Sequence, residues 1–183
     1  SCIDGSAILQ RVLWHFEVRE AYLLPVNVRI CNASCMKWLE GNELPDTDAE
    51  YEAFEKADCF MINVGKLSGE PEGPGHWPGH LTVVVPDLAG QHVVLDLTIV
   101  QAERPEFGIR VNPMMFPVGE DFLNGEAPFT LQRGGLTYVY LAYPDDLSYL
   151  DDDNTASEAK WEHAAQQILQ FMALRGFLKM RPE

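Results

Sequence analysis

The sequence predicts an α+β domain with a mostly antiparallel sheet and a helix near each end of the chain. Helical periodicity marks residues 2–16, runs of β-branched residues separated by turn signals fill the middle, and a second amphipathic pattern covers residues 154–177. No internal repeat or interdomain linker interrupts the 183 residues. We therefore expect residues 1–183 to form a single domain.

The first predicted helix begins beside a cysteine at position 2. Its apolar residues recur at helical spacing and predict one buried face, formed by Ile8, Leu9, Val12, Leu13 and Phe16. Ser1 or Asp4 is a suitable N-terminal cap. Residues 21–32 are rich in aliphatic side chains and predict a strand, in which Pro25 indicates an edge or a bulge.

Two short helices, a strand and a loop are predicted next. Residues 34–41 predict a helix closed by Gly41, and residues 47–57 predict another that Thr47 or Asp48 caps. Residues 59–65 read as a strand. Glycine and proline dominate residues 66–79, so we expect a loop there.

The clearest local signal is a hairpin. Two β-rich segments, residues 80–87 and 91–101, flank a short turn that contains Gly90. Residues 103–128 look irregular, and residues 136–144 predict one more strand. The last helix has a possible capping box at Thr155 and Glu158 and ends at Gly176.

The charge of the chain narrows the range of partners. A formal net charge of −15 argues against nucleic acid and against anionic membrane surfaces, both of which require a basic face. There is no apolar run of the length that spans a membrane. Five aspartates between Asp145 and Asp153 lack the spacing of a calcium loop and predict a solvated acidic segment.

Cysteine content indicates a reducing compartment. Four cysteines in a chain of this size do not make a disulfide framework, so we expect free thiols and a cytoplasmic protein. Cys31 and Cys35 have no second pair at zinc-finger distance, so no metal site is predicted there. Because the chain begins Ser-Cys without methionine, we expect that it has been processed or truncated upstream.

Three side chains together match what a thiol nucleophile needs. Cys2 lies at a predicted helix N-terminus, where the helix dipole favours the thiolate. His80 begins one strand of the hairpin, and Asp96 lies in the other, where the turn position predicts that the two face each other. Asp96 sits among apolar residues and needs a partner, so we predict Cys2, His80 and Asp96 as nucleophile, base and orienting acid.

Alternatives to this triad remain open from the residues alone. Cys2 on its own is compatible with an inert buried thiol. His76 and His92 are weaker candidates to bond Asp96. A third possibility is a metal site built from His76, His80 and Asp96, although the Trp-Pro-Gly between the histidines cannot be helical.

The pattern resembles the transglutaminase-like (papain-type) cysteine enzyme superfamily. The likeness runs through the Cys-bearing helix and following strand at residues 2–30, "GHLTVVVPD" with His80, and "VVLDLTIVQ" with Asp96, Thr98 and Gln101. The resemblance implies a papain/transglutaminase-like fold and a Cys2, His80, Asp96 triad. It also implies a hydrolase of the thiol protease type, either a cysteine peptidase or an amidase, that acts on a peptide or amide-bearing substrate without a cofactor.

Two substrate-binding residues and two alternative functions complete this interpretation. We expect Gln101 near the substrate and Trp77 as a wall of the site, or else Trp77 packed beneath a plain surface loop. An amine in place of water as acceptor would make the protein an acyltransferase of the same superfamily. The other alternative is a non-catalytic binding module that retains the fold.

Overall fold

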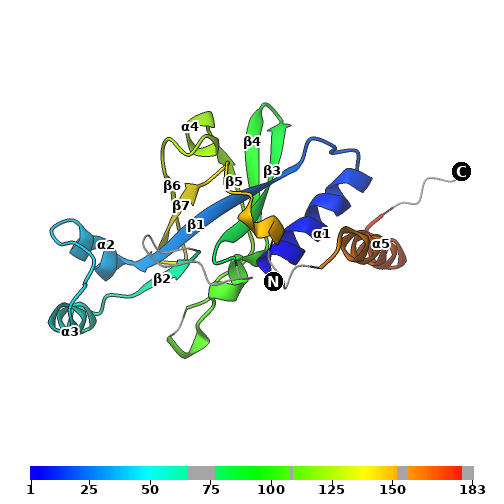
Figure 1. The fold of residues 1–183 in the computed structure, drawn as a ribbon. Coiled ribbons are helices and arrows are strands. Elements are labelled where there is room, and N and C mark those ends of the chain that lie inside the picture. The colour runs from blue at the N-terminus through cyan, green and yellow to red at the C-terminus, as the bar shows by residue number, and fades with distance from the viewer. Residues whose placement is uncertain (66–76, 108, 152–155, 179–183) are drawn as a thin grey trace, which may run out of the picture.

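The computed structural model describes residues 1–65, 77–107, 109–151 and 156–178 and contains one seven-stranded antiparallel sheet with helices beside it (Figure 1). The α-helices are α1 (Cys2–His15), α2 (Ala33–Leu39), α3 (Asp48–Lys56), α4 (Glu120–Leu123) and α5 (Glu158–Leu174). The strands are β1 (Tyr22–Asn32), β2 (Met61–Val64), β3 (His80–Leu88), β4 (Gln91–Asp96), β5 (Met114–Val118), β6 (Phe129–Arg133) and β7 (Leu136–Ala142). Three 3₁₀ helices are η1 (Thr98–Ala102), η2 (Pro105–Phe107) and η3 (Ser148–Asp151). The predicted α+β class with an antiparallel sheet is confirmed.

The sheet curls into a nearly closed barrel. Its strand order is β5-β4-β3-β1-β7-β6, and β2 pairs with β1 beside β3. The two edge strands approach through their side chains, because the rings of Phe116 on β5 and Phe129 on β6 stack with centroids 4.8 Å apart. Phe116 also lies 4.9 Å from the ring of Tyr140 on β7. The main apolar core therefore fills the inside of this curved sheet.

Pro25 lies in a central strand, where the sequence predicted an edge or a bulge. Residues 22–26 of β1 pair with β3, whereas the ladder with β7 begins only at Val26. The carbonyl of Pro25 accepts from Tyr143 N at 2.9 Å, just after β7 ends. A backbone N–H at position 25 would point to the same side as this carbonyl, toward the residues after β7. Proline therefore removes no hydrogen bond from the ladder between β1 and β7.

Helix α1 buries the predicted face only in part: Ile8, Leu9 and Leu13 are partly buried against the core, and the most buried positions lie beside them. Beside apolar Ile3 and Ala7 the buried positions include Ser6, Gln10 and Arg11, whereas Phe16 is exposed. The reason is that α1 lies between β3 and α5 and has two covered sides (Figure 1). These polar side chains have partners on the neighbouring elements, as in the bonds from Gln10 Nε2 to the carbonyl of Ala21 at 2.9 Å and from the Ser6 hydroxyl to the carbonyl of Leu81.

The ends of the other helices agree only in part with the predictions. Thr47 caps α3 and forms a capping box with Glu50, as expected. Helix α5 is instead preceded by Ser157 at its N-cap, and Thr155 lies outside the described residues. Gly176 follows α5 with φ +75°, the left-handed conformation that glycine adopts at helix ends.

The stretch from residue 103 to 128 is more regular than predicted. It contains η2, β5 and α4, and the unpredicted strand β6 follows it. Short strands with little apolar alternation, one of them carrying Pro117, leave a weak pattern in the sequence. No helix among the described residues is long and apolar enough to span a membrane.

Candidate active site

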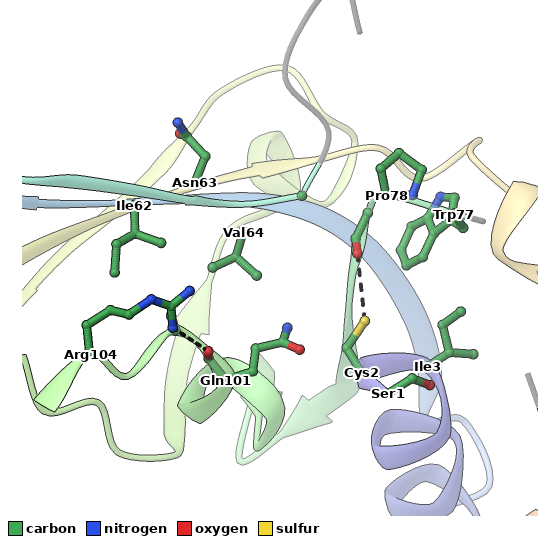
Figure 2. Close-up of a pocket in the computed structure, with 13 residues that line it drawn as sticks. Ser1, Cys2, Ile3, Ile62, Asn63, Val64, Trp77, Pro78, Gln101 and Arg104 are labelled. Atoms are coloured by element: carbon green, nitrogen blue, oxygen red, sulfur yellow. Dashed lines mark hydrogen bonds between the residues drawn. The ribbon is translucent and has the colours of Figure 1, made fainter. Parts of the chain in front are cut away.

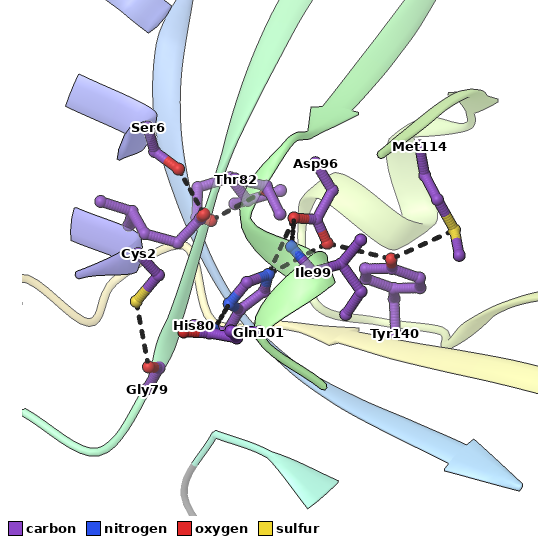
Figure 3. Close-up of polar contacts among 12 residues, drawn as sticks. Cys2, Ser6, Gly79, His80, Thr82, Asp96, Ile99, Gln101, Met114 and Tyr140 are labelled. Carbon is purple, nitrogen blue, oxygen red and sulfur yellow. Dashed lines mark hydrogen bonds and ion pairs between the residues drawn. The ribbon is translucent and has the colours of Figure 1, made fainter. Parts of the chain in front are cut away.

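Cys2 is the first residue of α1, and its thiol faces the start of β3. The side chain of Ser1 caps the helix by accepting from Asp4 N at 3.2 Å. Cys2 Sγ donates to the carbonyl of Gly79 at 3.7 Å (Figure 3). Burial raises the pKa of the Cys2 thiol, but the hydrogen bond and positive charge of His80, together with a hydrogen bond from the backbone of Leu81, hold this pKa below its ordinary value.

The first turn of α1 is anchored to the far end of the chain. Asp4 Oδ1 accepts from Trp161 Nε1 at 2.7 Å and from Ala156 N at 3.0 Å. Burial raises the pKa of Asp4, yet these donors together with Ser1 lower it overall. Asp4 is one of the two predicted caps of α1. The structure has Ser1 in that position, and Asp4 instead fixes the Cys2 end of α1 against α5.

His80 and Asp96 are in direct contact in the interior. His80 Nε2 lies 2.9 Å from Asp96 Oδ1 and 3.0 Å from Oδ2, and both side chains are fully buried. Their strands, however, do not place them opposite each other. The ladder pairs Val84 with Val94, a register that sets Asp96 opposite Thr82.

The predicted register is therefore wrong by two residues, and the reason lies in the turn. The hairpin closes tightly at Leu88↔Gln91, and a register shift separates this pair from Val85. His80 and Asp96 are diagonal neighbours on one face, a separation that a long imidazole side chain bridges.

Asp96 ends its strand as well as bonding His80. Its Oδ1 accepts from Ile99 N at 3.0 Å, which turns the chain into η1. Its Oδ2 accepts from Oη of Tyr140, a buried residue of β7, at 3.0 Å (Figure 3). His80, Ile99 and Tyr140 therefore provide hydrogen-bond donors to both oxygens of this buried carboxyl group.

Gln101 reaches the other nitrogen of His80 because the chain turns after Asp96. Residues 98–102 form η1, so the prediction of a strand through residue 101 is wrong. A continued strand would carry Gln101 about 16 Å beyond Asp96. The 3₁₀ turns instead bring Gln101 Nε2 to 3.0 Å from His80 Nδ1.

These contacts define the tautomer of the neutral imidazole. In the neutral ring, Nε2–H is donated to Asp96 and the lone pair of Nδ1 accepts from the Gln101 amide on the thiol side of the site (Figure 3). Protonation of Nδ1 replaces this lone pair with an N–H donor. Burial lowers the pKa of His80, but the charge and hydrogen bond of Asp96 and the adjacent Cys2 raise it to about 9. A raised His80 pKa and a lowered Cys2 pKa together favour a thiolate–imidazolium pair.

A pocket of about 390 Å³ opens in front of Cys2 (Figure 2). Its walls are Ser1 with the first two residues of α1, β2 with Gly65, the segment that precedes β3, and the end of η1 with Arg104. They are Ser1, Cys2, Ile3, Ile62, Asn63, Val64, Gly65, Trp77, Pro78, Gly79, Gln101, Ala102 and Arg104. The proposed nucleophile and both predicted substrate-binding residues thus border one cavity.

Trp77 combines the two roles that the sequence left open. It lines the pocket, and it is also packed, with its ring 5.6 Å from that of Tyr149 and its Nε1 donating to Asp146 Oδ2 at 3.1 Å. A Cβ on Gly79 would lie 2.0 Å from the indole, so glycine is needed for this packing. Asp146, from the predicted solvated acidic segment, therefore supports the site wall.

The other titratable candidates lie elsewhere or outside the described residues. His92 bonds Glu120 at 2.7 Å, away from Asp96, and His76 falls in a segment that is not described. Within the described ranges, no group of three or more His, Cys, Asp or Glu side chains is arranged to hold a metal ion. Cys31 on β1 and Cys35 on α2 are buried, and burial raises the pKa of each.

Three site residues were not predicted: Asn63, Arg104 and Tyr140. A tyrosine in the apolar strand β7 signals a buried hydroxyl that needs a partner, but nothing local identifies Asp96, which is 44 residues away. Asn63 lies on β2 and Arg104 lies two residues after η1, and both line the pocket. Neither position carries a sequence signal of its own.

Comparison of the chain with protein-family models, with curated proteins and with solved structures gave no match.

Proposed function

We propose that this protein is a thiol-dependent acyl-transfer enzyme of the transglutaminase-like type, and that it acts as a cysteine peptidase or amidase. The observation that carries the proposal is the arrangement around His80. One ring nitrogen bonds the buried Asp96, the other lies 3.0 Å from Gln101 Nε2 on the side of the ring toward Cys2 (Figure 3), and the Cys2 thiol has a lowered pKa beside an open pocket. Few structural roles require all these features at once.

The first half-reaction forms a thioester. The Cys2 thiolate attacks the substrate carbonyl carbon, and the carbonyl π electrons move to oxygen. The backbone N–H of Cys2, at the start of α1, is a suitable donor to this oxyanion. The imidazolium of His80 then protonates the leaving nitrogen, the C–N bond breaks, and an amine departs.

The second half-reaction returns the enzyme to its starting state. His80, now neutral, removes a proton from water, and the hydroxide attacks the thioester carbon. The C–S bond breaks, the acid product leaves, and the thiolate–imidazolium pair is restored. An amine in place of water gives transfer instead of hydrolysis. Asp96 holds the ring in one tautomer throughout and stabilises its positive charge.

A generic activated ester tests this proposal. We expect p-nitrophenyl acetate to release one p-nitrophenolate per chain rapidly and to leave one acetyl group on Cys2, located by peptide mass spectrometry. Cys2→Ala should abolish this burst, and His80→Ala should slow it about 10²-fold or more, the usual contribution of a general base.

Cys59 provides the matched control, because it is also partly exposed but burial raises the pKa of its thiol. Cys59→Ala should keep the burst. Equal acetylation of Cys2 and Cys59, or a burst on Cys2 that His80→Ala does not slow, would contradict the proposal. Added hydroxylamine or a primary amine then separates the acceptors, because a faster second step with the amine indicates transfer.

A further inference from the structure

Among the described side chains that line the pocket in front of Cys2, one is a cation and none is a carboxylate. Among its lining residues Arg104 is the single charged side chain. This contrasts with the whole chain, which has 28 acidic and 13 basic residues. In Figure 2, Arg104 and Cys2 lie on opposite sides of Gln101, so the pocket runs from the thiol to the guanidinium.

The guanidinium of Arg104 is held by the backbone on one side only. Its Nη1 donates to the carbonyls of Gln101 at 3.0 Å and Glu103 at 2.7 Å, which accounts for both hydrogens of that nitrogen. The backbone around it is also fixed, because Arg104 exchanges two hydrogen bonds with Ile109, at 3.2 and 3.0 Å. The guanidinium is therefore oriented before any ligand binds.

The opposite edge of the same group has no hydrogen-bond partner among the described residues. No described residue accepts from Nε or Nη2 of Arg104, and no described carboxylate lies within ion-pair distance. The neighbouring Glu103 side chain is 3.9 Å from Arg110 instead. Nε–H and Nη2–H are parallel donors whose spacing matches the two oxygens of a carboxylate.

The wall between the two ends is mostly apolar. Ile62 and Val64 of β2 face the pocket across from Gln101 (Figure 2). A ligand that occupies the pocket therefore meets a thiol at one end, an apolar middle, and an oriented cation at the other end. In an acidic protein, an anionic ligand would be repelled by most other surfaces.

We infer that the acyl donor of this enzyme carries a carboxylate, separated from the scissile carbonyl by a short apolar spacer, and that Arg104 binds that carboxylate. This inference rests on the proposed function and specifies its substrate class. Arg104 takes no part in the chemistry; it selects the substrate by bonding the anionic end while Cys2 attacks the carbonyl.

Paired electrophiles test the inference without knowledge of the natural substrate. Each probe is the chloroacetamide of an ω-amino acid, from glycine to 6-aminohexanoic acid, and its neutral partner carries a terminal carboxamide in place of the carboxylate. The thiolate displaces chloride from either probe. The measurement is the ratio of the second-order rate constants for Cys2, anionic probe over neutral probe, at each spacer length.

We expect the wild-type ratio to pass through a maximum at one spacer length. Arg104→Gln should lower this maximum about tenfold or more, the loss expected for one charge-assisted hydrogen bond. Arg104→Lys retains the charge without the two-donor edge and should give an intermediate ratio. Arg110→Gln is the matched control, because it removes an equal charge from a side chain outside the pocket and should leave the ratio unchanged.

The outcomes separate this inference from the proposed function. A ratio that is the same in wild type and Arg104→Gln at every spacer length would overturn the role of Arg104. An equal fall in Arg110→Gln would also overturn it, because a general charge effect would then explain the preference. Failure of the proposed function would be seen with the neutral probe. The rate of its reaction with Cys2 would then depend on pH as it does for an unperturbed thiol, and His80→Ala would not change that dependence.

Discussion

At the scale of single residues, Asp96 organises the candidate site. One carboxylate bonds His80, ends β4 through Ile99 N, and accepts the hydroxyl of Tyr140. The sequence identified Asp96 because a carboxylate among valines and leucines needs partners. It identified His80 as the nearest partner. The same argument could not identify Tyr140, because the contact between Tyr140 and Asp96 depends on the curvature of the whole sheet.

The hydroxyl of Tyr140 should stabilise the fold through Asp96. We expect Tyr140→Phe to lower the free energy of unfolding by about 1–3 kcal/mol, because a buried carboxylate loses a donor. Tyr138→Phe is the control on the same strand: its ring is equally buried, but no described residue bonds its hydroxyl. Denaturant unfolding measures both, and equal losses would contradict a specific role of the Tyr140 hydroxyl.

His80 should make stability depend on pH in the alkaline range. Its pKa is about 9 in the folded protein and about 6.5 in an unfolded chain, so the folded state binds the proton more tightly. This stabilisation is complete below about pH 6.5 and is lost as the pH rises through about 9. The difference in free energy of unfolding between wild type and His80→Gln should therefore shrink over that range, and a constant difference would argue against the raised pKa.

At the scale of elements, the site depends on how closely α1 approaches η1. Helix α1 and the β3–β4 hairpin were predicted from strong local patterns, a capped helix and a tight turn with Gly90. Helix η1 was mistaken for strand, since Thr98, Ile99 and Val100 favour strands and the hydrogen bond from Ile99 N to Asp96 overrides that preference. Gln101 owes its place beside His80 to this turn.

Gly5 permits the close approach of the two elements. A Cβ at Gly5 would lie 2.5 Å from Thr98 Cγ2, so Gly5→Ala should push η1 away from α1 and move Gln101 relative to Cys2. We expect slower alkylation of Cys2 by iodoacetamide at neutral pH. Thr98→Ser removes that methyl group, so the double variant Gly5→Ala, Thr98→Ser should recover the rate; no recovery would show that the helix itself, and not this contact, is the cause.

At the scale of the whole molecule, the sheet closes around its main core through two rings, Phe116 and Phe129, that do not line the Cys2 pocket. The stacked Phe116 and Phe129 join strands at opposite edges of the sheet without a backbone ladder between them. The sequence predicted the fold class, but it gave no indication of this closure. Strands β5 and β6 are short and irregular in pattern, and each pairs only with a strand adjacent to it in the sequence, so no strand pairing records the approach of one sheet edge to the other.

The Phe129 ring should therefore matter for global stability and not for the thiol. Phe129 is half-buried, so we expect Phe129→Ala to cost about 2–3 kcal/mol, below the range for a fully buried phenylalanine. Tyr51→Ala, an exposed aromatic on α3, should change stability by less than about 0.5 kcal/mol. Under native conditions the alkylation rate of Cys2 should be the same in wild type and in both variants; a marked loss in Phe129→Ala alone would show that sheet closure also shapes the site.

The pKa of the Cys2 thiol tests the central claim most directly. It is measured as the rate of iodoacetamide alkylation of Cys2 against pH, followed by peptide mass spectrometry in wild type and His80→Ala. The account predicts a midpoint below about 8.5, the value of an unperturbed cysteine, and an upward shift of that midpoint when His80 is removed. A wild-type midpoint near 8.5 that His80→Ala leaves unchanged would contradict the assignment of Cys2 as an activated nucleophile.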